Sequence, residues 1–355
     1  MVYTVMIDNL NSPESDVHLY NPDDGIPVLI AALEEKVKRE NHLSDVSVMV
    51  TAGANQAYMN CVLTLLGEGQ KGIVFRPYYF NHVMAIQMTR GDEGLLVGPY
   101  VGDSGLPDVD WLREQLEQDQ MKDPGERINL VTVVDPCNPT GLKIPSTVME
   151  QIVSLCKQYG VWLVVDNTYE HFDHVDGSED FPCHNDPHVI NIFSFSKGYS
   201  MAGFRVGYIT VSNSSEASRA MYQQMLKVQD TIPICVSGIS QLAALGALQT
   251  GRQWVLDQVK TLDVGREAVL AAMSSLETII GGSGAMYIMG KLPDGIDDVE
   301  FARTLVSDHG IAVIPGSFCA APGWIRVCYS NLPPEECKRA SVRLADGINK
   351  LTSRA

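Results

Sequence analysis

The sequence is poor in positive charge and lacks any long apolar run. It contains 26 Lys and Arg residues against 43 Asp and Glu residues, which gives a formal net charge of −17 at pH 7. Nucleic acids and anionic membranes are bound through clustered cations, so this balance argues against both as partners. No stretch approaches the roughly 18 apolar residues that a membrane-spanning helix requires. We therefore expect no nucleic-acid partner and no membrane partner.

Cysteines are scattered, and no two of them form a Cys-x-x-Cys pair. The sequence has eight cysteines in 355 residues, a pattern typical of reduced thiols rather than of a disulfide framework. The first residues, MVYTVMIDNLNSPESD, lack both the basic start and the apolar centre of a secretory signal. These features predict a cytoplasmic protein.

Apolar, β-branched runs alternate with helical patterns over most of the chain. Continuous apolar strands that alternate with helices predict a mostly parallel sheet covered on both faces. Helical patterns are clearest at 57–66 and 146–160. The expected strands are 46–50, 72–75, 95–98, 128–134, 161–165, 189–193 and 206–211.

The pattern changes from about Gln241 onward. An amphipathic helix is expected over roughly 252–276, followed by the strand-like GAMYIMGKL, a helix near 298–309 and the apolar segment around WIRVCYS. This order predicts a second, smaller α+β domain. The expected division is an N-terminal segment over 1–25, a large domain over 26–245 and a small domain over 246–355.

Three partial motifs occur in the wrong context. GEGQKG at 67–72 fits a dinucleotide fingerprint, but it follows a helix and precedes a strand. GDSG at 102–105 is similar to a serine-protease loop, but the chain is not all-β. A group of possible metal ligands has no standard zinc spacing and lies in a polar, Asp-rich loop, so no metal is expected. This group consists of His171, His174, Cys183, His184 and His188.

Two polar segments that follow predicted strands can bind a ligand at the edge of an α/β sheet. Gly53, Ala54 and Asn55 begin a helix, where small residues let backbone N–H groups point at an anion; an ordinary strand–helix turn is the alternative. In VVDPCNPTG, two prolines would fix Asn138 at the end of a strand as a hydrogen-bonding group; a plain turn is the alternative.

Two further segments carry an acid and an amine at strand ends. Asp166 follows four apolar residues, so its carboxylate needs a cation or a strong donor, and Tyr169 is close enough in sequence to share a ligand; a helix N-cap is the alternative role of Asp166. Lys197 lies among small residues, where desolvation would lower its pKa and yield a nucleophilic amine; a solvent-facing lysine is the alternative. Ser194, Ser196 and Arg205 can form a clamp for a dianion.

One ligand satisfies all four segments. It has a phosphate for the backbone and Arg205, an aldehyde for Lys197, a ring nitrogen for Asp166 and a ring hydroxyl for Asn138 and Tyr169. This ligand is pyridoxal 5′-phosphate (PLP), whose protein signature is a lysine Schiff base and a carboxylate on the ring nitrogen.

In order and spacing, these segments resemble the class I/II aminotransferases of fold type I, from Tyr20 to Arg326. The resemblance implies a mostly parallel, seven-stranded sheet sandwiched by helices, with a smaller α+β domain. Several phrases, among them VTAGANQA, PYYFN and VQDTIPIC, most resemble plant aromatic-amino-acid or methionine aminotransferases that act on indole-3-pyruvate. The motifs are Tyr20 with Gly25, GANQA at 53–57, PYY at 77–79, NPTG at 138–141, DNTY at 166–169, SFSK at 194–197, GFRVGY at 203–208 and IRVCYS around Arg326.

The resemblance implies a role for each matching residue. Lys197 would carry the Schiff base and move the proton, and Asp166 would keep the ring nitrogen protonated. Arg326, with Asn138, would bind the α-carboxylate of an amino acid or 2-oxo acid. Tyr20 would reach the phosphate of a neighbouring subunit, which implies a homodimer. The remaining cofactor contacts would be Ala54, Asn55, Tyr79, Asn138, Tyr169, Ser194, Ser196 and Arg205.

Two departures from the family pattern concern the substrate side. The family has a longer segment before Tyr20 that covers the substrate, and its usual Leu-Arg is Leu29–Ile30 in this sequence. The cofactor motifs favour amino transfer as the function. The alternatives are a lyase or synthase reaction on the same cofactor and a non-catalytic regulator of the same fold.

Overall fold

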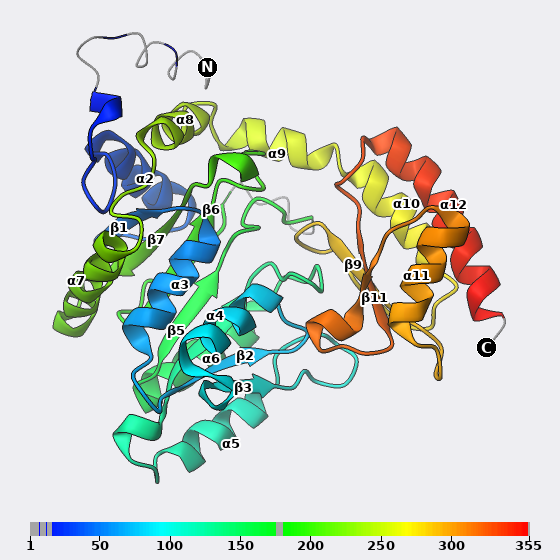
Figure 1. Cartoon of the computed structure of the whole chain (residues 1–355), viewed down its shortest axis with the longest axis horizontal. Coiled ribbons are helices and arrows are strands. Elements are labelled where there is room, and N and C mark those ends of the chain that lie inside the picture. Colours follow the sequence, from blue (N-terminus) through cyan, green and yellow to red (C-terminus); the bar gives the residue numbers. More distant parts are fainter. Residues whose placement is uncertain (1–6, 8–11, 13–15, 175–179, 354–355) are drawn as a thin grey trace.

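The computed structural model describes residues 7, 12, 16–174 and 180–353. Most of the predicted N-terminal segment therefore lies outside the described residues. Figure 1 shows a large sheet with helices around it and a smaller part built from the C-terminal third of the chain. None of the helices in the described ranges is both long and apolar enough to cross a bilayer.

The large sheet has seven strands in the order β1-β7-β6-β5-β4-β2-β3. All neighbours are parallel except β7, which runs antiparallel to both β1 and β6. The connection from β6 to β7 contains only a short 3-10 helix, η4 (Ala202–Phe204), and a parallel crossover needs a longer one. The strands are β1 (Val46–Thr51), β2 (Lys71–Phe75), β3 (Leu95–Gly98), β4 (Ile128–Val134), β5 (Trp162–Asp166), β6 (Val189–Ser194) and β7 (Gly207–Ser212).

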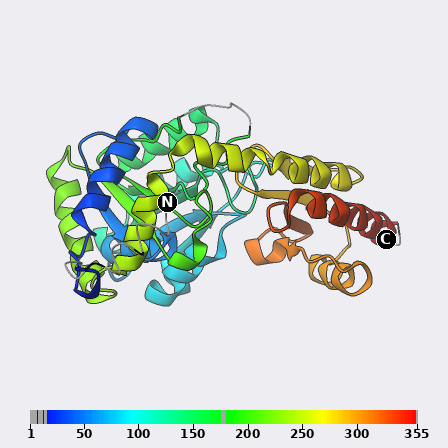
Figure 2. The same ribbon diagram turned by 90° about the horizontal axis from the view of Figure 1, so that it is seen from above.

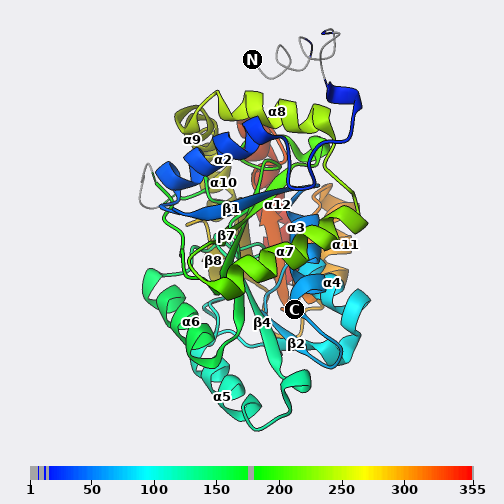
Figure 3. The ribbon, with the colours of Figure 1, turned by 90° about the vertical axis from the view of Figure 1, so that its left-hand side faces the viewer.

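Alternate strand residues point to opposite faces of this sheet, and both faces are covered by helices. Met49 packs with one helical layer and Val48 with the other. Figure 3 shows the two layers on either side of the strands. One layer contains α3 (Ala54–Leu65), α4 (Phe80–Arg90) and α7 (Glu216–Thr231); the other contains α2 (Pro27–Glu40), α5 (Val109–Asp119), α6 (Ser146–Tyr159) and α8 (Gly238–Leu248). The predicted α/β fold is confirmed.

The C-terminal part has its own four-stranded antiparallel sheet, ordered β10-β11-β9-β8, and its own apolar core. Figure 2 shows it beside the large sheet, with its helices packed along one side. Its strands are β8 (Ile279–Gly281), β9 (Tyr287–Lys291), β10 (Ile314–Pro315) and β11 (Trp324–Cys328), and its helices are α10 (Asp263–Met273), α11 (Asp298–His309) and α12 (Pro334–Thr352). The exact limits of the predicted domains stay a prediction.

The single helix expected over 252–276 is wrong. The structure has two helices there, α9 (Arg252–Lys260) and α10, separated by Thr261 and Leu262. The N–H groups of Thr261 and Leu262 bond to Gln258 and Val259, three residues back, and the Thr261 hydroxyl also donates to the Gln258 carbonyl. These tighter bonds break the i→i−4 ladder, which an amphipathic pattern alone does not reveal.

Helix ends follow local chemistry. Ser215 caps α7 by accepting a hydrogen bond from the Ser218 N–H, and Asp108 caps α5 in the same way. Gly160 ends α6 with a φ of 69°, in the left-handed region where glycine carries no Cβ penalty. Asp297 caps α11 by accepting from the N–H groups of both Val299 and Glu300, at 2.9 and 2.8 Å.

Replacement Asp297→Ala should lower the free energy of unfolding by about 1 kcal/mol, because both helix N–H groups lose their acceptor. Asp294→Ala, at an exposed residue of the preceding turn, is the matched control and should stay within about 0.5 kcal/mol of the wild type. Urea unfolding measures both values. Equal stability of the two variants would show that this cap does not stabilise α11.

Candidate active site

A cavity of about 230 Å³ lies at the carboxyl ends of the central strands. Every predicted site residue except Tyr20 lines it. The predicted residues that meet there are Ala54, Asn55, Tyr79, Asn138, Asp166, Tyr169, Ser194, Ser196, Lys197, Arg205 and Arg326. Five further lining residues were not predicted: Phe80, Val134, Thr168, Ala202 and Tyr287.

The sheet explains this convergence. Because β4, β5 and β6 are parallel, Val134 pairs with Asp166 and Asp166 pairs with Ile192. The segments that follow these strands therefore leave the sheet at one edge, where open α/β sheets bind ligands. Residues distant in sequence are thereby brought together at one edge of the sheet.

One end of the cavity is shaped for an anion. Gly53 has a φ of 82°, and a Cβ added to it would lie 2.2 Å from the Arg205 Nη2 atom. The guanidinium thus lies directly against the start of α3, which has no side-chain cap. Arg205 Nη1 donates to the Ala202 carbonyl at 2.8 Å and to Ser196 Oγ at 3.5 Å. Free helix N–H groups and a guanidinium together suit a phosphate.

The Asp166 carboxylate is buried and held at both oxygens. Its Oδ1 accepts hydrogen bonds from the Thr168 N–H at 3.0 Å and from the Thr168 hydroxyl at 2.6 Å. Its Oδ2 lies 3.1 Å from His82 Nε2. The His82 ring is itself packed between Tyr58 and Tyr79, with ring centroids 4.1 and 5.4 Å away.

The alternative role of Asp166 as a helix N-cap is wrong. No helix follows it within 167–174 or 180–201; the carboxylate instead caps a turn at Thr168. Since neither oxygen has a lysine or arginine partner in the described ranges, the carboxylate stays available to a cationic group in the cavity.

A chain of polar contacts links four residues of the cavity wall. Arg326 Nη1 donates to Asn138 Oδ1 at 2.8 Å, and Asn138 Nδ2 lies 3.5 Å from the Tyr169 hydroxyl. The Tyr169 and Tyr287 hydroxyls are 2.9 Å apart, and the Arg326 guanidinium lies 4.6 Å from the centre of the Tyr287 ring. Arg326 Nε is buried and has no hydrogen-bond partner in the described part of the chain.

Burial sets the protonation of the two tyrosines. It raises the pKa of Tyr169 well above the usual tyrosine value, and the neighbouring Tyr287 raises it further. Burial also raises the pKa of Tyr287. Both hydroxyls are therefore protonated at neutral pH, so each can donate one hydrogen bond and accept others.

Lys197 is half-buried and opens onto the cavity. Across residues 16–174 and 180–353, its amine has no hydrogen-bond or ion-pair partner. The lysine is thus neither a fully exposed surface residue nor one engaged in a structural ion pair. An unengaged amine inside a polar cavity is suited to attack a carbonyl.

Tyr20 is the predicted residue that the structure does not bring to this cavity. Its side chain is 82% exposed and lies outside the set of lining residues. The prediction places it in the site of a neighbouring subunit, and that assignment stays a prediction.

Of two important residues that were not predicted, one had a usable signal in the sequence and the other did not. His82 lies in the first turn of α4, three residues after Tyr79, so both face the same direction. Tyr287 lies in β9, where Met289 pairs with Arg326 and Cys328 pairs with Tyr287. Diagonal neighbours on one face of an antiparallel pair are in reach of each other, but this pairing needs the sheet register.

The histidines and the cysteine that the sequence analysis set aside as metal ligands are not gathered around one point. No group of three or more His, Cys, Asp or Glu side chains in the described chain is arranged to hold a metal ion. His188 Nε2 lies 3.0 Å from the Val153 carbonyl, and His174 Nε2 lies 2.9 Å from the Tyr329 hydroxyl. These histidines have separate partners in the fold.

Comparison with known proteins gives a family. Residues 5–344 match the family "Aminotransferase class I and II". The chain is 43% identical over 335 residues to the aromatic aminotransferase ISS1 of Arabidopsis thaliana, which covers 94% of this chain and 82% of that protein. An aspartate aminotransferase of Pyrococcus abyssi is 26% identical and covers 88% of this chain and 79% of its own length.

Solved structures agree. A double mutant of the Thermus thermophilus aspartate aminotransferase superposes with a TM-score of 0.83 at 27% identity, covering 98% of this chain and 87% of that one. An aromatic aminotransferase from Pyrococcus horikoshii gives a TM-score of 0.85 at 24% identity, covering 99% and 92%, and supports the fold. With the family match over nearly its whole length, this chain belongs to the class I and II aminotransferases and is a transaminase.

Proposed function

We propose that the cavity binds PLP through Lys197 and that the enzyme transfers an amino group between an aromatic amino acid or methionine and a 2-oxo acid. The observation that carries this proposal is the unengaged Lys197 amine in one cavity with the Asp166 carboxylate and the Arg205 guanidinium. An amine, a carboxylate and an anion site are the three groups that this cofactor requires.

The residues at each end of the cavity fit the cofactor. Arg205, packed against Gly53, would hold the phosphate with the N–H groups of Ala54 and Asn55 and with Ser194 and Ser196. Asp166, fixed by Thr168 and His82, would pair with the ring nitrogen. The ring face would meet Tyr79, and the ring hydroxyl would meet Asn138 and Tyr169. When bound, PLP supplies an electron sink for charge that develops at the substrate Cα.

The remaining roles belong to the substrate half. Arg326 would hold the α-carboxylate, since its Nε is buried and has no hydrogen-bond partner among the described residues. The Tyr287 ring, 4.6 Å away, supports the guanidinium. The Lys197 amine would accept and return the proton at Cα as general base and acid. Asn138, hydrogen-bonded to Arg326, would orient both the cofactor ring and the substrate carboxylate.

The substrate class is supported by two observations. The relative at 43% identity is named an aromatic aminotransferase, whereas relatives below 30% include aspartate aminotransferases. The cavity wall includes the rings of Tyr79, Phe80 and Tyr287, which suit an apolar side chain. A homodimer in which Tyr20 reaches the neighbouring phosphate is part of the same proposal.

The wild type supplied with PLP should be yellow and should lose its visible band when an aromatic amino donor alone is added. Lys197→Ala should lose the covalent link and about 10²–10⁴-fold in turnover, because the proton-transfer group is gone. Lys227→Ala, exposed on α7, is the matched control and should behave as the wild type. Absorbance spectra and a panel of amino donors provide the measurement. A wild type that stays colourless with PLP would contradict the proposal.

Replacement Gly53→Ala should weaken PLP binding by tenfold or more, roughly the loss of one charged hydrogen bond, because the new Cβ displaces the Arg205 guanidinium. Gly295→Ala is the matched control: its φ is 88°, and a Cβ there meets no atom within 4 Å. Both glycines have a positive φ, so both replacements strain the backbone, but only the first should change the dissociation constant measured by fluorescence titration. Equal PLP affinities of the two variants would show that Arg205 does not bind the phosphate.

Two replacements of Tyr287 separate its hydroxyl from its ring. Tyr287→Phe loses the bond to Tyr169 and should weaken PLP binding about 2–10-fold while leaving the KM for the amino donor unchanged. Tyr287→Leu also removes the ring below Arg326 and should raise that KM by about 3–30-fold. Steady-state kinetics measures both. An unchanged KM in Tyr287→Leu would show that the ring does not support Arg326.

A further inference from the structure

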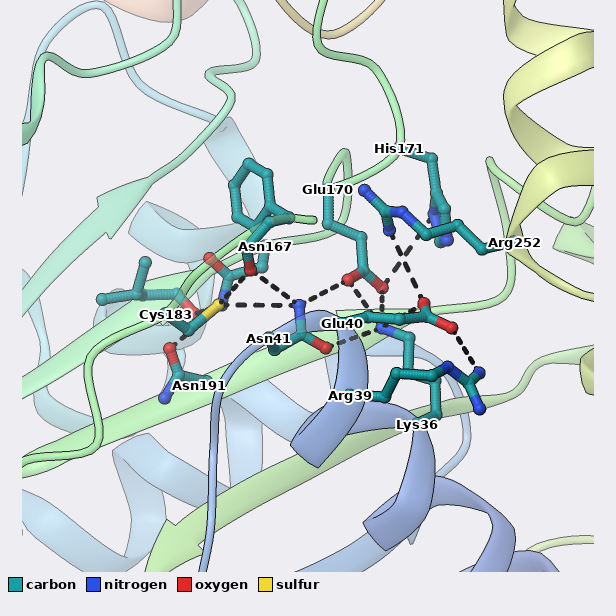
Figure 4. A network of polar contacts seen from close by, with 12 residues as sticks. Lys36, Arg39, Glu40, Asn41, Asn167, Glu170, His171, Cys183, Asn191 and Arg252 are labelled. Atoms are coloured by element: carbon teal, nitrogen blue, oxygen red, sulfur yellow. Dashed lines mark hydrogen bonds and ion pairs between the residues drawn. The ribbon is translucent and has the colours of Figure 1, made fainter. Parts of the chain in front are cut away.

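A triad of buried polar side chains, part of a larger polar network that includes Glu40, packs against the segment that follows β5 (Figure 4). Lys36 Nζ, from α2, lies 2.6 Å from both carboxylate oxygens of Glu170. Asn41 joins the two, accepting from Lys36 Nζ at 2.9 Å and donating to Glu170 Oε2 at 2.8 Å. All three residues are at most 3% exposed. The candidate site uses none of them.

The charged groups of this triad are buried and paired with each other. Burial by itself would raise the pKa of Glu170, but Lys36, His171 and Arg252 outweigh it and lower this pKa to about 2, so the carboxylate is ionised. Well-packed apolar side chains often stabilise a fold as well as a buried ion pair does. A buried pair with every partner satisfied does fix one geometry, which apolar contacts do less strictly.

The triad is one residue away from the site. Tyr169 lines the cavity with its hydroxyl, whereas the adjacent Glu170 points away from it into the triad. The turn between them and β5 is short: the Glu170 N–H donates to the Asn167 carbonyl at 3.0 Å, and Asp166 binds Thr168. Holding Glu170 therefore limits how far Tyr169 and Asp166 can move.

The same region also supports the chain on both sides of Lys197. A Cβ added to Gly198 would lie 2.6 Å from His171 Nδ1, so the residue after Lys197 packs directly on the His171 ring. On the other side, Lys36 Nζ lies 4.9 Å from the centre of the Phe193 ring, in β6. The end of β6 and the segment that follows it are thus packed against Lys36 and His171.

We propose that the Lys36–Asn41–Glu170 triad is a positioning device, which sets the Tyr169 hydroxyl and the Lys197 backbone for amino transfer. The inference rests on the proposed function, because it concerns the placement of groups toward PLP. Lys36, Asn41 and Glu170 are positioning residues, since they act through Tyr169, His171 and Phe193 and do not reach the cavity themselves.

The test compares a broken triad with one replaced as a whole. Lys36→Met leaves the Glu170 carboxylate buried without its cation and should lower the urea midpoint strongly. The triple variant Lys36→Met/Asn41→Leu/Glu170→Met removes the three polar groups of the triad and leaves Glu40 paired with Arg252, so it should recover most of that midpoint. Asp119→Asn is the matched control for stability, because Asp119 is a buried carboxylate that accepts from the Ile128 N–H far from the cavity.

Placement is read from kinetics and from colour. In the PLP-loaded triple variant, kcat should stay about 10–100-fold below the wild type, with KM within about threefold, since misplaced groups impair the reaction more than binding. The pH at which the Lys197-linked cofactor changes its absorbance should shift by about half a unit or more, because the surroundings of that nitrogen change. Asp119→Asn should change neither quantity.

The outcomes separate the two proposals. A triple variant with the kcat and absorbance midpoint of the wild type would overturn the positioning role alone. An Asp119→Asn variant that changes both quantities as much as the triple variant does would also overturn it. If the triple variant does not fold, Glu170→Gln decides: it keeps the size of the side chain but removes its charge and leaves one oxygen to accept from Lys36 and Asn41. An unchanged absorbance midpoint would overturn the role, whereas a shift supports it. A wild type that takes up no PLP would overturn the proposed function, and the positioning role with it.

Discussion

The parallel pairing of β4, β5 and β6 is the constraint on which the candidate site depends. It fixes Val134 beside Asp166 and Asp166 beside Ile192, so that three chain segments leave the sheet at one edge. An antiparallel neighbour would send its following segment to the other edge. The antiparallel β7 instead returns the chain so that Gly207 lies against Ala54, with a Cβ added to Gly207 only 2.8 Å from the Ala54 nitrogen.

Two carboxylates four residues apart are treated in opposite ways. Asp166 is held by neutral or weakly basic donors, Thr168 and His82, and faces the cavity. Glu170 is held by the ammonium group of Lys36 and is shut away from the cavity. The first arrangement leaves charge for a ligand to meet, and the second satisfies the charge inside the protein. The segment 167–169 is therefore held to the protein interior through Glu170, while Asp166 on its other side faces the cavity.

Local sequence was enough to predict the residues that directly follow strands. Asn138, Asp166 and Lys197 stand out because polar groups after apolar runs need partners, and the cavity contains all three. Arg326 was predicted from the family resemblance alone. The seven strands of the large sheet were predicted because β-branched runs mark them. The observed strand ends agree with the predicted ones to within about a residue or two.

Other features depend on contacts that sequence patterns do not carry. Tyr287 reaches Arg326 through the β9–β11 register, and Lys36 pairs with a carboxylate 134 residues away. The break between α9 and α10 comes from the turn bonds of Thr261, within a pattern that is amphipathic on both sides. Each of these features comes from a tertiary contact or a local hydrogen bond, which the hydrophobic periodicity of the sequence does not show.

The proposed function depends most on covalent attachment of PLP at Lys197. Borohydride reduction of the protein mixed with PLP, followed by protease digestion and mass spectrometry of the peptides, tests this directly. The mass of the reduced cofactor should be found on the peptide that contains Lys197. A cofactor mass on a different lysine, or none on any peptide while the enzyme catalyses amino transfer, would contradict this proposal.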